Sequence, residues 1–430
     1  MRKPDLSSRR SSHRAPRYVS LACAVAALSA GCVDTVSLGS GDGETEEERP
    51  AIPIVPWLPS TGPVWQDIDE DLLHCKPDLE TDLDEDGFTP AQGDCNDCDP
   101  DVGPNAVEMP TDMGPAKDEN CDGLVDEPLP ICDAGIPVDT TNPHAAARAL
   151  DLCADARKDI WGNDRWGIEE AAWVLPDGTP ELTTRAYALG HGVLDRFGPN
   201  VPVRRGARML ALSSGTARQP TDPDYEPPRG YDKGFTCAPP AGFPQAAPSC
   251  PGVPSGAPHD GIALELTLRA PQNAEAFAFD YDFYTYELPD HFCTSSNDLF
   301  VALLHPPPSS APDANIAFDA AGNLVSVNTV LLEACSCPGG PPCLIGGRQH
   351  ACALGSAPLL GTGFGNDLSH EGDRGATGWL TTTADIARGG TITLRFSIHD
   401  AANGYADSTV LIDHFRWLRR EPIVPKSRRD

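Results

Sequence analysis

A pattern of an acid, an acid or amide, and an acid at alternate positions, followed by a glycine, occurs twice in this chain. The first run is Asp82-Leu83-Asp84-Glu85-Asp86-Gly87-Phe88, and the second is Asp118-Glu119-Asn120-Cys121-Asp122-Gly123-Leu124. This spacing turns alternate side-chain oxygens toward one centre, and the glycine permits the sharp turn that follows. Seventeen Asp and Glu lie between positions 78 and 127 against a single Lys. Their mutual repulsion favours a bound cation.

The ligand chemistry of these two runs favours calcium, which takes about six to eight oxygen ligands. Copper prefers imidazole or sulfur ligands, and no histidine lies between His74 and His144. Copper remains an alternative because Met109, Met113 and the cysteines could supply sulfur, and an acidic linker that binds nothing is another. The expected ligands are Asp82, Asp84, Asp86, the Phe88 carbonyl, Asp94, Asp97 and Asp99 around the first run, and Asp118, Asn120, Asp122 and Asp126 around the second.

The N-terminus predicts export. A basic segment, Arg2 to Arg17, precedes a short apolar run, Val19 to Ala30, so residues 1–31 are expected to be a signal peptide. Ser29-Ala30-Gly31-Cys32 resembles the lipobox of bacterial lipoproteins, which implies acylation of Cys32 and a membrane anchor. Val33 favours the outer membrane or cell surface by the same resemblance. A periplasmic protein and an ordinary signal peptide cut near Ala30 are the alternatives.

Charge and cysteine content narrow the class of protein. The net charge of −31 argues against nucleic-acid binding, which needs Lys and Arg. Thirteen cysteines remain after Cys23 and Cys32, an odd number that would leave one thiol over in a compartment permitting disulfides. Residues 32–74 are expected to be an acidic, proline-rich and disordered spacer, 75–132 a small acidic metal-binding module, and 421–430 a basic tail.

Alternating apolar residues predict strands beyond position 138. Runs of period two separated by Gly and Pro loops are typical of an antiparallel β-sandwich, here expected to be jelly-roll-like over residues 138–420. A helix is expected between Asn142 and Ile160. The expected strands are Met209–Ser213, Ala263–Leu268, Ala276–Tyr284, Phe300–Leu304, Thr391–Ile398 and Thr409–Asp413.

Two stretches resemble known families. Residues 82–127 resemble the metal-binding motif of MopE type found in exported myxobacterial proteins, through Asp82–Phe88, Gly93–Pro100, Pro104–Glu108 and Asn120–Glu127. That family carries a copper label. Residues 140–418 resemble the choice-of-anchor L domain of bacterial surface proteins, through Met209–Gly215, Phe279–Glu287, Ser296–Val301, Gly378–Leu380 and Asp407–Phe415. That resemblance implies a secreted β-rich domain and no reaction.

The sandwich offers few candidates for chemistry. Glu287, Asn297 and Asp298 could form a second cation site or bind a ligand, although Asp298 could equally be a turn residue before a strand. Asp400 is expected in a hairpin turn. The sequence contains neither a Gly-x-Ser-x-Gly elbow nor His-Glu-x-x-His, so we expect no enzyme. A binding or adhesion protein with an unknown protein or glycan partner is favoured. A copper carrier is one alternative. A hydrolase is another, and it would bring Glu287, Asp298, His291 and His399 into one cleft.

Overall fold

A computed structural model describes residues 78–109, 116–318, 323–328, 332–335, 337, 340–365, 374–402, 404–419 and 426–429. The expected signal peptide, the lipidation site Cys32 and the spacer lie outside these residues. Among the described residues, no helix has the length and apolar character needed to cross a membrane. Residues 426–429 of the expected basic tail form a strand.

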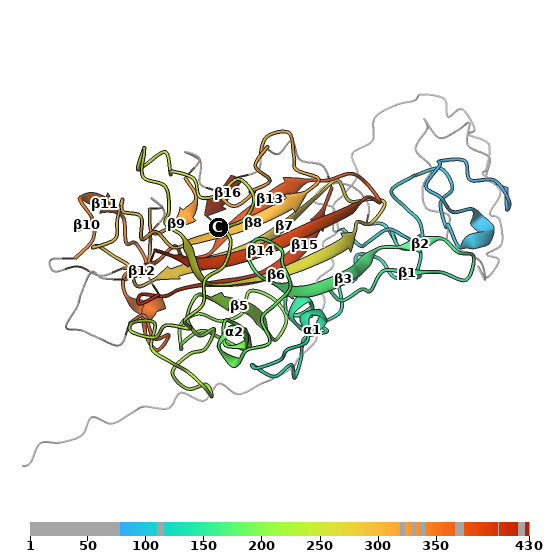
Figure 1. Ribbon diagram of the computed structural model, residues 1–430. Helices are drawn as coiled ribbons and strands as arrows, with labels where there is room; N and C mark the ends of the chain where they lie inside the picture. The colour runs from blue at the N-terminus through green and yellow to red at the C-terminus, as the bar shows by residue number, and fades with distance from the viewer. Residues whose placement is uncertain are drawn as a thin grey trace, which may run out of the picture. The chain divides into compact units, whose positions relative to one another are not determined.

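Two antiparallel sheets form most of the fold, which confirms the prediction of a mainly β, sandwich-like domain (Figure 1). The larger sheet contains β16 (Lys426–Arg429), β13 (Leu380–Asp385), β7 (Ala276–Thr285), β15 (Ser408–Leu418), β5 (Met209–Ser213) and β4 (His191–Leu194) in this order, with β12 (Gly375–Ala376) beside β7. The smaller sheet contains β3 (Gly167–Val174), β6 (Pro258–Arg269), β14 (Thr391–Ala401), β8 (Leu299–His305) and β9 (Val325–Ser326).

Short elements surround the sandwich. Two hairpins and four helical turns lie in the connections, and none of the described helices exceeds six residues. The hairpins are β1 (Arg157–Lys158) with β2 (Asp164–Arg165), and β10 (Cys343–Ile345) with β11 (Arg348–His350); the helices are α1 (Pro143–Arg148), α2 (Arg185–Ala188) and the 3-10 turns Pro90–Gln92 and Ala357–Leu359.

Aromatic side chains of β7 fill the space between the sheets. Every residue of this strand is buried. Phe279 contacts Phe396 of β14 edge to face, with ring centroids 4.9 Å apart, and Tyr281 lies 5.2 Å from Phe300 of β8. Each such buried side chain stabilises the fold by roughly 1.5–3 kcal/mol relative to exposure. The alternation of β7 therefore sets which face joins the core.

The predicted strands correspond to β5, β6, β7, β8, β14 and β15. The helix expected between Asn142 and Ile160 is wrong beyond its first turns, because α1 ends at Arg148 and Asp151 takes a left-handed φ of 70°. The hairpin turn expected at Asp400 is also wrong. Asp400 lies in β14, and the chain then crosses to β15 in the other sheet.

Five disulfides join described cysteines, as expected for a protein that folds in an oxidising compartment outside the cytoplasm. Two of them pair the four cysteines of the 335–352 segment with one another. Cys237 is the free thiol among the described residues, in line with the odd cysteine count. The bonds are Cys95–Cys121, Cys132–Cys153, Cys250–Cys293, Cys335–Cys352 and Cys337–Cys343.

Candidate metal centre in the acidic loops

The first acidic run folds into a tight loop held by its own carboxylates. Asp82 Oδ2 accepts a hydrogen bond from the Gly87 amide at 2.9 Å. Asp84 Oδ1 accepts from the Asp86 amide at 3.2 Å, and Asp86 Oδ1 accepts from the Phe88 amide at 2.7 Å. Gly87 has φ 97°, a conformation that a side chain would strain. One oxygen of each carboxylate therefore shapes the loop, and the second oxygens of Asp82 and Asp84 have no donor.

The second acidic run repeats this conformation residue for residue. Asp118 Oδ2 accepts from the Gly123 amide at 2.9 Å, the Asn120 side chain accepts from the Asp122 amide at 2.9 Å, and Asp122 Oδ1 accepts from the Leu124 amide at 2.8 Å. Gly123 has φ 92°, close to the value at Gly87. The same spacing thus produces the same turn twice.

Carboxylates of the first loop gather into one cluster with two acids from further along the chain. Ligating oxygens of Asp82, Asp84 and Asp86 lie within 4.8 Å of one another, as do those of Asp84, Asp94 and Asp97. Asp82 Oδ1, Asp84 Oδ2 and Asp94 Oδ2 are buried with no hydrogen-bond donor. A buried carboxylate oxygen without a donor carries a large desolvation penalty. These residues could therefore hold a cation.

Burial and mutual repulsion raise the pKa of these acids. The pKa of Asp84 is raised to about 7 by burial and by neighbouring Asp86, and the pKa of Asp94 is also raised to about 7 by burial and the same neighbour. Burial raises the pKa of Asp86 to about 6. A divalent cation placed among them would stabilise the charged forms.

The sandwich holds the first cluster through Gln272. Its side-chain amide donates to Asp86 Oδ2, and its backbone amide donates to the Asn105 carbonyl at 3.2 Å. A Cβ on Gly103 would collide with both the Asp86 carboxylate and the Gln272 amide. Glycine at 103 is therefore required for this close approach.

A second cluster includes acids that sequence reasoning missed. Oxygens of Glu108, Glu119 and Asp126 lie within 4.8 Å of one another. Glu119 is fully buried, and its Oε1 accepts from Arg419 at 2.6 Å, while its Oε2 has no donor. Burial raises the pKa of Glu108 to about 7, with Glu119 and Glu127 adding to the effect. The signal for Glu108 was its place in the Pro104–Glu108 stretch.

Some expected ligands lie outside these clusters. Asp99 forms an ion pair with Lys117 at 2.8 Å. Asp118 and Asp122 belong to neither acidic cluster, and their described bonds are to backbone amides of their own loop. The Phe88 side chain is buried, with the Arg165 guanidinium 5.0 Å above its ring. Of the second set of expected ligands, Asp126 alone joins a three-acid cluster.

Sulfur donors near the loops are already used. Cys95 and Cys121 form a disulfide that joins the two loops, and Cys98 is also disulfide-bonded. Met109 is packed into the sandwich core with 7% exposure. Met113 lies outside the described residues. The described part of this region therefore offers oxygen ligands in place of the soft ligands that copper prefers.

Of the three candidate residues in the sandwich, Glu287 and Asp298 are in contact, and both are buried. The Asp298 amide donates to Glu287 Oε2 at 3.1 Å, whereas the Asn297 side chain donates to Ser255 at 2.9 Å. His399 is buried, and burial lowers its pKa to about 4. Two cavities of the described structure, of about 1120 and 510 Å³, are not lined by Glu287, Asp298, His291 or His399.

A groove of about 1120 Å³ lies between the acidic loops and the β1–β2 hairpin. Trp161 at the hairpin tip is 50% exposed. Trp166 follows β2, and its indole donates to the Ala106 carbonyl at 3.2 Å. Figure 1 shows β1 and β2 beside the loops. The lining includes Gln92, Gly93, Asn120 and Cys121 from the loops, and Asp155, Arg157, Lys158, Asp159, Trp161, Arg165 and Trp166 from the hairpin region.

No protein-family model matches the chain, and no curated protein does. Among solved structures, TmCBM61 in complex with beta-1,4-galactotriose is similar at 9% identity and a TM-score of 0.19, covering 54% of this chain and 83% of that one. The mannan-recognising carbohydrate-binding module TmCBM27 is similar at 11% identity and a TM-score of 0.20, covering 60% and 99%.

Proposed function

We propose that this chain is an exported surface protein, anchored by a lipid at Cys32, whose acidic loops bind calcium and whose groove binds a glycan. The observation that carries the calcium assignment is the set of buried, donor-less oxygens on Asp82, Asp84 and Asp94. They belong to a cluster of five carboxylates. Calcium accepts such an all-oxygen set, and its flexible coordination suits loops of irregular geometry.

The calcium serves a structural role in this proposal. It neutralises the cluster, and the Cys95–Cys121 disulfide holds the second loop beside the first. Asn120 and Cys121 of the second loop also line the groove. Calcium bound by the loops would therefore fix one wall of the groove, since metal binding and local folding are coupled.

The groove is suited to a carbohydrate. The exposed ring of Trp161 offers an apolar face for the C–H side of a sugar, and the half-buried Trp166 lies in the same lining. Arg157, Lys158 and Asp155 line the same groove and offer charged groups to sugar hydroxyls. The proposed MopE-type and choice-of-anchor L relationships agree with an exported, non-catalytic surface protein.

A calcium titration of the EDTA-treated protein tests the metal assignment. Asp84→Asn removes an acid shared by both first-loop triads, so calcium affinity at that site should fall by about tenfold or more. Asp99→Asn is the matched control, because Asp99 pairs with Lys117 and should leave affinity within about twofold. The assignment would be overturned by copper that stays bound in native mass spectra when EDTA-buffered calcium is also present.

The anchor has its own test. Cys32→Ser should move the protein from the membrane fraction to the soluble fraction and abolish incorporation of labelled fatty acid. Lipidation would be rejected if Cys32→Ser stayed in the membrane fraction and the wild type incorporated no labelled fatty acid.

A further inference from the structure

Two arginines lie opposite each other on the β1–β2 hairpin, and both line the large groove. Arg157 of β1 pairs with Arg165 of β2 in the antiparallel register, so their Cβ atoms are neighbours about 4.5–5.5 Å apart. At the next cross-strand position Lys158 lies opposite Asp164, and these side chains form an ion pair at 2.8 Å. One position of the hairpin thus carries complementary charges and the other carries like charges. Like charges directly opposite each other destabilise a strand pair unless a third group neutralises them.

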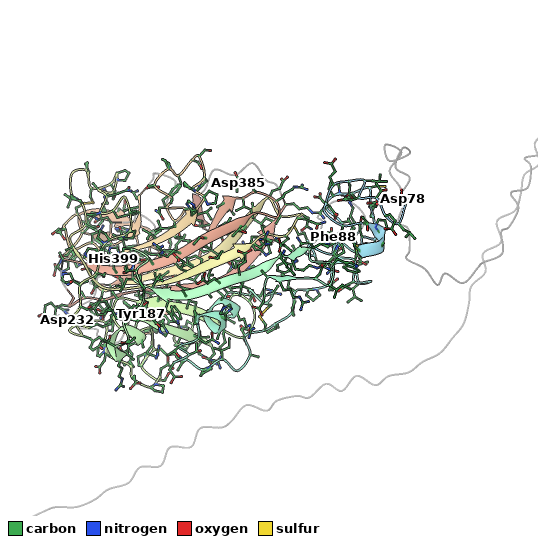
Figure 2. The ribbon with its side chains drawn as sticks, turned by 45° about the vertical axis from the view of Figure 1, so that its right-hand side comes forward. Asp78, Phe88, Tyr187, Asp232, Asp385 and His399 are labelled. Carbon is green, nitrogen blue, oxygen red and sulfur yellow. A yellow bond between two sulfur atoms is a disulfide. The ribbon has the colours of Figure 1, made fainter. Side chains whose placement is uncertain are left out.

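Arg165 is held on the loop side of the groove. Its guanidinium donates to a backbone carbonyl of the neighbouring loop and lies 5.0 Å above the Phe88 ring. Asp159 Oδ2 is 3.7 Å from Arg165 Nε, which is beyond hydrogen-bond distance. Burial lowers the pKa of Arg165, and Arg157 adds to this effect while Asp159 opposes it. Figure 2 shows Phe88 at the opposite end of the sandwich from His399, so Arg165 lies at the loop end of the molecule.

Arg157 provides a second positive charge that nothing in the described structure balances. Its side chain is exposed, and its guanidinium takes part in no ion pair or hydrogen bond with the described residues. The two acids in the groove lining are already engaged. Asp155 lies 3.6 Å from Arg148, and Asp159 Oδ1 accepts from two backbone amides of the hairpin at 2.9 Å. Since Lys158 has its own partner, the charges left in the groove are two guanidiniums against one carboxylate.

The chemistry of these groups favours one kind of anion. A guanidinium binds a carboxylate through two parallel N–H···O bonds, which a hydroxyl group cannot match. The half-exposed ring of Trp161 lies in the same lining and offers an apolar face. A sugar that carries a carboxylate presents both an apolar C–H face and a planar anion. The groove therefore has a complementary group for each part of such a ligand.

We propose that the groove binds a sugar acid, a glycan unit bearing a carboxylate, with the carboxylate between Arg157 and Arg165 and the sugar ring against Trp161. This inference rests on the proposed glycan function of the groove and narrows its ligand class. A carboxylate between the two arginines removes their repulsion, whereas a neutral sugar leaves it in place. The net charge of −31 does not prevent binding, because charges more than about 8–10 Å away are largely screened at physiological salt.

Paired oligosaccharides test the ligand class on the calcium-loaded full chain. Oligomers that contain galacturonate, glucuronate or N-acetylneuraminate are each compared with their methyl esters, which keep the sugar and remove the charge. Free calcium is held at one concentration throughout. At least one acid should bind about tenfold or more tightly than its ester. Raising the salt from about 0.05 to 0.5 M should weaken binding of the acid and leave binding of the ester within about twofold.

Arg157→Gln tests the residue assigned to the carboxylate. This variant should bind the acid about tenfold or more weakly than the wild type, so that acid and ester bind alike. Arg196→Gln is the matched control, because Arg196 is also an exposed arginine and does not line the groove. The control should leave both affinities within about twofold of the wild type.

Arg157→Glu gives a readout that needs no ligand. The introduced carboxylate lies opposite Arg165, so an attractive pair replaces a repulsive one. Without glycan, this variant should unfold at a higher temperature than the wild type. Saturating acid should raise the melting temperature of the wild type and leave that of the variant unchanged.

The outcomes separate this inference from the glycan proposal. Equal binding of acids and esters, together with weaker binding of both by Trp161→Ala, would show a neutral glycan in the groove and overturn the sugar-acid assignment alone. A preference for the acid that persists in Arg157→Gln would also overturn it, because the carboxylate would then bind elsewhere. A wild type that binds none of these glycans and no other glycan on an array would reject both proposals.

Discussion

Buried carboxylates without donors are the residues on which this account depends. In the first loop, Asp82, Asp84 and Asp86 come from one short segment, and their spacing was enough to predict the cluster. Glu108 and Glu119 meet only because the chain folds back. Local spacing cannot reveal such contacts, since they depend on strand register and packing.

At the residue scale, the burial of His191 predicts that the stability of the fold depends on pH. His191 is stacked on Trp173 with ring centroids 4.0 Å apart, and burial, with Arg218 and Lys233 nearby, lowers its pKa to about 3 from the ordinary 6.5. Below pH 6.5 the unfolded chain therefore binds a proton that the folded chain does not, and stability falls as pH falls. At pH 5 this loss is about 2 kcal/mol relative to pH 7.

Urea unfolding at pH 7 and pH 5 measures this effect by comparing the wild type with His191→Phe. The phenyl ring keeps the stacking on Trp173 but cannot be protonated. The variant should lose about 2 kcal/mol less stability than the wild type over this interval. Equal losses in the two proteins would mean that His191 has the same pKa in the folded and the unfolded chain.

At the scale of elements, alternation predicted the central strands and failed at irregular ones. Met209–Ser213 was predicted with its observed bounds as β5. Strand β3 was missed because a register shift between Ile168 and Glu170 breaks its alternation, and it exposes two consecutive glutamates. The expected helix stopped early because the chain turns at Asp151 and is then held by the Cys132–Cys153 disulfide. The hydrophobic periodicity of a sequence does not by itself reveal β-bulges or disulfides.

The β1–β2 hairpin gives a prediction about binding. Trp161→Ala should weaken binding of a glycan found by array screening by about five- to tenfold, because one stacked ring is lost. Its stability should change by less than about 0.5 kcal/mol, since the ring is half exposed. Leu344→Ala, at an exposed apolar position on β10, is the control. Equal binding by both variants would place the glycan site elsewhere. A wild type that binds no glycan would reject the glycan proposal.

At the scale of the whole molecule, the acidic loops and the sandwich are one packed body. Val107 and Met109 lie in the sandwich core, and Asn273 both accepts from the Val107 amide at 3.0 Å and donates to its carbonyl at 2.8 Å. The sequence predicted an acidic module over residues 75–132, and its packing against the sandwich could not be predicted because these apolar residues are too few to show periodicity. Calcium bound by the loops would therefore stabilise the sandwich as well as the loops.

The central claim is that calcium occupies the first acidic cluster, and diffraction locates it most directly. Crystals grown with calcium, measured at a wavelength where calcium scatters anomalously, should give a difference peak among Asp82, Asp84 and Asp94. The surrounding oxygens should lie about 2.3–2.6 Å from it. The claim would be contradicted by calcium-saturated crystals with no peak there and with these carboxylates hydrogen-bonded to one another.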